Sequence, residues 1–166
     1  TLEYDKLVLA VGATPVIPAL EGRELNGIFT LSSIADANAI RSYLATLPNR
    51  EVVILGAGLI WLEMAEAFAG RGLKVTVIEA LDWVLPALLD REIAAHIEKH
   101  LRAKGVSIRL GERASGFLGD GQGRVRRVAV GSDEIPAGLV LLSIGVRPNT
   151  TLAKEAGLTI GTRGGI

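Results

Sequence analysis

Short apolar runs alternate along the chain with stretches whose apolar residues recur at helical spacing. The apolar runs predict strands at residues 7–11, 52–55, 74–79, 106–110 and 139–144. Helical spacing predicts three helices, which lie between a cap at Ser33 or Asp36 and Pro48, from 59 to 70, and between Asp90 and Gly105. A further short helix is expected after Asn149, which can cap it, and should end at Gly157.

Between residues 112 and 135 the pattern changes to short segments, a glycine-rich turn at 119–123 and alternation at 124–130. Alternation around Asp120-Gly121 predicts a hairpin in an antiparallel meander. Strand and helix alternate on the N-terminal side of this meander, and a continuous apolar strand follows it. We therefore expect a Rossmann-like three-layer α/β domain, a parallel sheet with helices on one face and a small antiparallel β-meander on the other.

The region 52–79 carries the clearest chemical signal: an apolar strand, a glycine turn that opens a helix, a second strand and a carboxylate. Gly56 permits the tight turn, and Gly58 lets the backbone approach a pyrophosphate at the helix N-terminus. Glu79 stands where an acidic side chain accepts hydrogen bonds from an adenosine ribose. It would repel a 2′-phosphate, and residues 80–90 contain no Lys or Arg. We therefore expect dinucleotide binding with a preference for NADH over NADPH.

Trp61 departs from this pattern, because the third position of G-x-G-x-x-G normally holds a glycine where the helix packs closely on the first strand. An indole there is expected either to wedge the helix away or to turn outward across the path of the pyrophosphate. Each arrangement would displace or cover the Leu59 and Ile60 amides and weaken NADH binding by roughly tenfold to a thousandfold. Trp61→Gly is then expected to tighten binding.

Bulk composition narrows the function classes. The 166 residues carry 18 basic and 18 acidic side chains, a net charge of zero that argues against nucleic acid as the main partner. No apolar run has membrane-spanning length, no signal peptide is recognisable, and cysteine is absent, so a cytoplasmic protein without disulfides is expected. His96 and His100 have i, i+4 spacing but no acidic or cysteine partner nearby, so no metal site is expected. A strand pattern at one end and an unfinished turn at the other suggest a segment of a longer polypeptide.

Four segments resemble the central NAD-binding domain of the FAD-dependent pyridine nucleotide–disulfide oxidoreductases, in particular their NADH oxidase and coenzyme A-disulfide reductase branch. They are LVLAVGATPVIP at 7–18, LGAGLIWLEMAEAF at 55–68, VTVIEALDWVLP at 75–86 and LLSIGVRPNT at 141–150. The resemblance implies a crossover strand from an FAD domain at 1–20, the NAD-binding domain at 21–149 and a crossover back at 150–166. Residues 164–166 resemble the start of the strand that returns to the FAD domain. The FAD-binding unit, redox cysteine and dimerisation domain would lie in other parts of a full-length homodimer, so this chain alone should bind no flavin and catalyse no turnover.

The resemblance also suggests roles for individual residues. Leu59 matches a residue near the flavin face, Glu63 a carboxylate near the nicotinamide amide, and Gly145 a glycine whose backbone approaches the cofactor. The implied function is transfer of hydride from NADH to FAD and on to a disulfide, oxygen or another acceptor. Two alternatives remain open: a non-catalytic binding or scaffold module whose nucleotide site Trp61 impairs, and an independent NAD-dependent dehydrogenase. The second is the weaker, because no catalytic His, Lys, Tyr or Ser set accompanies the glycine pattern.

Overall fold

The computed structural model describes residues 2–47, 49–162 and 164–166. Thr1, Pro48 and Arg163, which fall in the predicted crossover segments and at the predicted end of the first helix, lie outside the described residues. At the centre of the fold is a five-stranded parallel sheet with the order β2-β9-β3-β4-β5. Its strands are β2 (Ile28–Thr30), β3 (Glu51–Leu55), β4 (Lys74–Ile78), β5 (Ser107–Arg109) and β9 (Leu139–Leu142).

Two different layers cover this sheet, as the sequence predicted. Side chains on β3 alternate between them: Ile54 packs into one buried cluster with residues of the helices, and Val53 packs into a second with residues of the meander. The helices are α1 (Ile34–Leu44), α2 (Leu59–Ala69) and α3 (Arg91–Ala103), and the meander strands are β6 (Ala114–Gly119), β7 (Val125–Val130) and β8 (Asp133–Pro136). The three-layer α/β prediction is therefore confirmed.

Local capping explains where the helices begin. Ser33 caps α1, and its hydroxyl accepts from the Asp36 backbone N–H at 3.1 Å while the Asp36 carboxylate accepts from the Ser33 N–H at 3.0 Å. Hydrogen bonds from the Ser32 backbone and hydroxyl, with that from Ser33, hold the pKa of Asp36 below its ordinary value. Asp90 caps α3 through the Ile93 N–H at 3.0 Å. Of the two caps that the sequence offered for the first helix, Ser33 is confirmed, and α3 begins directly after Asp90 as expected.

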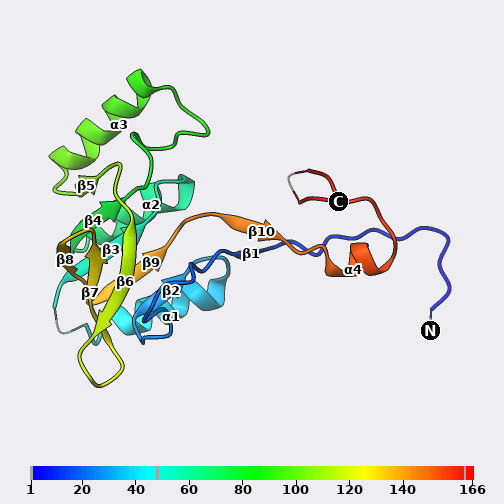
Figure 1. Ribbon diagram of the computed structural model, residues 1–166, viewed down its shortest axis with the longest axis horizontal. Coiled ribbons are helices and arrows are strands. Elements are labelled where there is room, and N and C mark those ends of the chain that lie inside the picture. The colour runs from blue at the N-terminus through cyan, green and yellow to red at the C-terminus, as the bar shows by residue number, and fades with distance from the viewer. Residues whose placement is uncertain (1, 48, 163) are drawn as a thin grey trace.

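The N-terminal and C-terminal segments extend away from the layered body (Figure 1). In the part of these segments that the structure describes, β1 (Ala13–Pro15) and β10 (Val146–Pro148) form an antiparallel pair, in which Ala13 lies opposite Pro148. The Asn149 side chain strengthens the pair: it accepts from the Thr14 hydroxyl at 2.7 Å and donates to the Val11 carbonyl at 3.0 Å. Thr14 and Asn149, which are 135 residues apart in sequence, are thus held side by side.

Three local predictions were wrong. Residues 7–11 form no strand, because no neighbouring strand pairs with them in the described chain, and Leu7 and Val8 are 62% and 85% exposed. The short helix α4 (Thr151–Glu155) begins after Thr150, not Asn149, whose side chain is used by the β1–β10 pair. Residues 164–166 are likewise not in a strand. An apolar run becomes a strand only where another backbone can satisfy its hydrogen bonds.

Candidate functional site

A cavity of about 800 Å³ opens at the carboxyl ends of β3, β4 and β9. Chain connectivity runs outward from β3 in one direction through β4 and β5, whereas β9 lies on its other side, so the strand order reverses between β3 and β9. Such switch points are where open α/β sheets bind ligands. The lining comes from five segments and two outlying residues: 55–58, 78–81, 85–88, 112–114 and 143–145, with Pro18 and Leu20.

The glycine turn forms one wall. Gly56 has φ of +93°, and a Cβ there would clash with the carbonyl oxygen of Ser143 and lie 2.8 Å from its carbonyl carbon. Gly58 is different: it is the exposed N-cap of α2, has φ of −79°, and a Cβ would meet no atom closer than 3.9 Å. Gly56 therefore allows the turn to pack against the end of β9, whereas Gly58 leaves open space beside the helix N-terminus.

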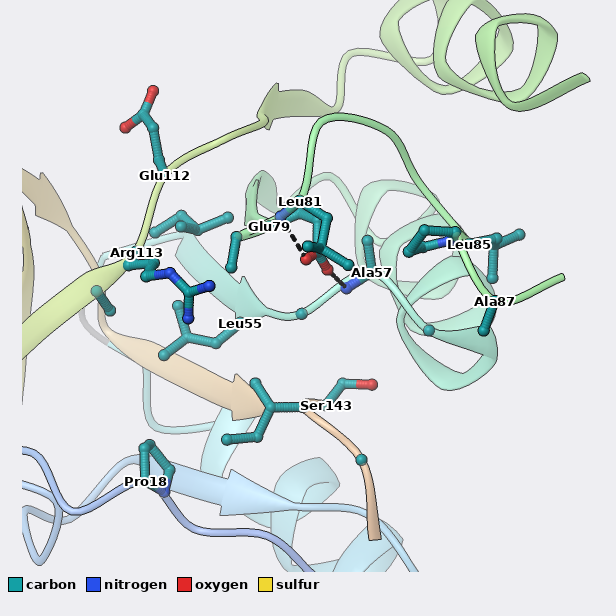
Figure 2. A pocket seen from close by; sticks show the side chains of 18 of the residues that line it. Pro18, Leu55, Ala57, Glu79, Leu81, Leu85, Ala87, Glu112, Arg113 and Ser143 are labelled. Carbon is teal, nitrogen blue, oxygen red and sulfur yellow. Dashed lines mark hydrogen bonds between the residues drawn. The ribbon is translucent and has the colours of Figure 1, made fainter. Parts of the chain in front are cut away.

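Glu79, which follows β4, links the end of that strand to the glycine turn after β3. Its side chain is buried, with Oε2 accepting from the Ala57 N–H at 2.5 Å and Oε1 accepting from the Leu81 N–H at 2.9 Å (Figure 2). Each carboxylate oxygen still has a lone pair that a ligand hydroxyl could use. The carboxylate thus fixes the glycine turn and also offers acceptors to the cavity.

The loop after β4 forms an apolar wall that bears Leu81, Leu85 and Leu88. The Leu85 N–H donates to the Ala57 carbonyl at 2.9 Å, so the Ala57 residue is held on one side by Glu79 and on the other by this loop. Leu85 has φ of +53°, an uncommon conformation for a branched residue. The loop and the glycine turn are therefore one connected structure.

The opposite wall comes from the segment that leads into β6. The Glu112 N–H donates to the Glu79 carbonyl at 3.0 Å, and the Gly111 N–H donates to the Leu81 carbonyl at the same distance. Glu112 forms an ion pair with Arg109 at 2.7 Å, and Arg109 also contacts Asp133 at 2.7 Å. These two carboxylates raise the pKa of Arg109. The next residue, Arg113, lines the cavity, and its side chain points into it (Figure 2).

The structure brings together four of the residues predicted from the sequence: Gly56, Gly58, Glu79 and Gly145 all line the cavity. Leu59, Ile60 and Glu63 do not. They lie on the first turns of α2 and are exposed, Leu59 by 62% and Ile60 by 41%. Sequence reasoning missed the residues of the loop after β4 and the Glu112–Ala114 wall. No motif identifies them, since only the folded sheet brings position 113 beside position 79.

Trp61 does not turn outward across the cavity. Its indole is fully buried in the cluster between the sheet and the helices, and it is not among the cavity-lining residues. Of the two positions expected from the sequence, the outward-turned one is therefore wrong, and the indole lies on the inner side of α2, where it packs in one cluster with Val52 and Ile54 of β3. The indole Nε1 has no hydrogen-bond partner in the described part of the chain.

The structure also places the two histidines that the sequence singled out for their spacing. His96 and His100 lie on the exposed side of α3, and the described residues contain no group of three or more His, Cys, Asp or Glu side chains that could hold a metal ion. Within the described ranges, none of the helices is both long and apolar enough to cross a bilayer.

Comparison with known proteins agrees with this geometry. Residues 1–166 match the family model described as pyridine nucleotide-disulphide oxidoreductase. An NAD(P)H coenzyme A polysulfide/persulfide reductase of Pyrococcus horikoshii is 43% identical over 164 residues, covering 99% of this chain and 36% of that protein.

Solved structures extend the comparison. An NAD-dependent persulfide reductase from A. fulgidus superimposes with a TM-score of 0.90 at 42% identity, over 96% of this chain and 29% of that one. A water-forming NADH oxidase from Lactobacillus brevis, solved with NADH bound, gives a TM-score of 0.87 at 29% identity, over 98% and 35% of the two chains. The chain thus spans about a third of the length of the relatives that it matches.

Proposed function

The chain belongs to the pyridine nucleotide-disulphide oxidoreductases, and we propose that its cavity binds the adenosine and pyrophosphate of NADH. The observation that carries this proposal is the arrangement of Glu79 beside the glycine turn at the strand-order reversal. The adenosine ribose hydroxyls would donate to the two Glu79 oxygens, and the pyrophosphate would lie against Gly58 and the N-terminus of α2. The cavity volume of about 800 Å³ lies within the range typical of small-molecule and cofactor sites.

The nicotinamide half would extend from the pyrophosphate toward the end of β9, where Gly145 lines the cavity. Gly145 has φ of +109°, and a Cβ there would meet no atom within 4 Å, so a ligand can approach its backbone closely. Leu59, Ile60 and Glu63 are exposed outside this cavity, and we assign them to its outer margin toward the nicotinamide. This placement is part of the proposal, and the NADH titration described below tests it.

In the complete protein, we propose that NADH reduces FAD held by another part of the polypeptide, and that electrons pass on to a disulfide, oxygen or another acceptor. The flavin supplies the redox chemistry, and this chain orients the nicotinamide against it. We further propose that 21–149 is the NAD-binding domain, that 1–20 and 150–166 connect it to the FAD domain, and that the complete protein is a cytoplasmic homodimer. The chain itself would bind NADH without turnover.

The alternative of a scaffold with a dead nucleotide site depended on obstruction by Trp61. The indole is buried and does not cover the cavity, which favours nucleotide binding over the scaffold alternative. Calorimetric titration of the protein with NADH separates the two functions: saturable binding at one site supports the proposal, and no heat at millimolar NADH contradicts it.

Coenzyme choice gives a sharper prediction. NADH should bind more tightly than NADPH, because the buried Glu79 carboxylate lies where a 2′-phosphate would come. Glu79→Gln should weaken NADH binding by about tenfold or more, since the new amide cannot accept from both the Ala57 and Leu81 N–H groups and a ribose hydroxyl. It should weaken NADPH binding less, because one negative charge is removed.

Fluorescence titration of both coenzymes measures these effects. Glu92→Gln is the matched control, since Glu92 lies exposed on α3 and outside the cavity. Tighter binding of NADPH than NADH by the unsubstituted protein would contradict the role of Glu79.

A further inference from the structure

The cavity has an uneven distribution of charge. Its charged lining residues in the described chain are Glu79, Glu112 and Arg113. Both Glu79 oxygens accept backbone N–H groups, and Glu112 is paired with Arg109 at 2.7 Å. The guanidinium of Arg113 makes no hydrogen bond or ion pair with any residue that the structure describes. A free cation therefore faces the cavity next to a carboxylate that is already engaged.

Backbone geometry fixes which part of the cavity Arg113 can reach. The Glu112 N–H bonds to the Glu79 carbonyl at 3.0 Å, so residue 113 follows directly after the point where this wall touches the end of β4. Side chains alternate along an extended segment. Glu112 accordingly points away from the cavity, toward Arg109, while Arg113 points inward (Figure 2). The glycine turn, where the pyrophosphate would bind, lies on the other side of Glu79.

We propose that Arg113 is a determinant of coenzyme choice, which supplies the positive charge for a 2′-phosphate on the adenosine ribose. This inference rests on the proposed function, because it assumes that the ribose binds at Glu79. A guanidinium offers several donors in a fixed plane and binds phosphate in a bidentate manner. It offsets the repulsion that Glu79 exerts, so that NADPH is disfavoured but still accepted. If Arg113 contacted only the pyrophosphate, which NADH and NADPH share, it would not distinguish one coenzyme from the other.

The test compares NADH and NADPH in parallel titrations of the unsubstituted protein, Arg113→Ala, Arg113→Lys and Arg124→Ala. Arg124 is an exposed arginine at the β6–β7 hairpin, outside the cavity, and its replacement removes the same charge. Arg113→Ala should raise the ratio of the dissociation constants, NADPH over NADH, by about tenfold, with NADH affinity changed by less than about threefold. Arg113→Lys should keep part of the effect, and Arg124→Ala should leave the ratio unchanged.

Each other outcome has a definite meaning. Equal losses for NADH and NADPH would overturn the inference and assign Arg113 to the adenine or the pyrophosphate, which the two coenzymes share. An unchanged ratio in Arg113→Ala would also overturn it. If the unsubstituted protein bound neither coenzyme, the proposed function itself would fail, and the inference with it. Thermal unfolding of each variant, followed by circular dichroism, confirms that the exposed Arg113 was replaced without loss of the fold.

Discussion

Trp61→Gly is expected to lower the free energy of unfolding by about 4–6 kcal/mol. Trp61 is completely buried between the sheet and the helices, so its removal leaves a cavity in the main core. Loss of a buried aromatic costs about 3–5 kcal/mol, and glycine within α2 adds about 1 kcal/mol. A domain with a total stability of about 5–15 kcal/mol could lose most of it. Urea denaturation measures the change.

Trp61→Phe is the matched control. It keeps an aromatic ring in the core and removes an indole N–H that has no partner among the described residues, so the net loss should be below about 2 kcal/mol. Because the indole does not line the cavity, NADH affinity should be unchanged in this variant. The tighter binding that the sequence suggested for Trp61→Gly should accordingly not occur. A clear gain in NADH affinity for Trp61→Phe would show that the indole does act on the nucleotide site.

Gly56→Ala should be the most damaging single change at the site. A Cβ at this position would lie 2.8 Å from the Ser143 carbonyl carbon and 3.1 Å from the Ile144 Cα, and φ is +93°. Backbone strain and overpacking each cost about 1–3 kcal/mol, so we expect a loss of about 2–5 kcal/mol. The glycine turn must also move, which separates the Ala57 N–H from Glu79 and should abolish measurable NADH binding.

Gly58→Ala tests the same turn without the clash, since a Cβ there meets no atom closer than 3.9 Å and φ is −79°. Its unfolding free energy should stay within about 1 kcal/mol of the unsubstituted protein, while NADH binding weakens because the methyl group fills space beside the pyrophosphate. Urea denaturation and NADH titration of both variants separate the two roles. Equal stability losses for Gly56→Ala and Gly58→Ala would contradict the packing described between the turn and β9.

The sequence predicted best what depends on neighbours along the chain. The unit from Glu51 to Ile78 follows from two apolar runs and a glycine turn, and each of its elements forms where expected. The cap at Ser33 and the start of α3 after Asp90 are equally local. Strand β2 was missed because it has only three residues and is stabilised by pairing with β9. The apolar run 7–11 failed for the converse reason, since its hydrophobicity indicates burial but cannot show which surface would bury it.

The residues of the candidate site also fall into two groups, those that a local motif contains and those that only the fold brings together. Gly56, Gly58 and Glu79 were identified because one motif contains them. Arg113 could not be, because its position beside Glu79 results from a backbone hydrogen bond between segments that are distant in sequence. The sequence left two positions open for the Trp61 indole for a related reason. The volume available to an indole depends on how α1, α2 and α3 pack together, and the glycine pattern contains no information on that packing.

The pairing of β1 with β10 has a mechanical consequence. Ala13 lies opposite Pro148, so the segments that leave this pair toward both chain ends depart from the same end of it. Tension applied through those segments would separate the two strands one residue pair at a time from that end, instead of shearing all pairs together. The three pairs should therefore open at low force, before any load reaches the central sheet. The body that holds the cavity can thus tilt relative to whatever is attached to it while its own interior remains undeformed.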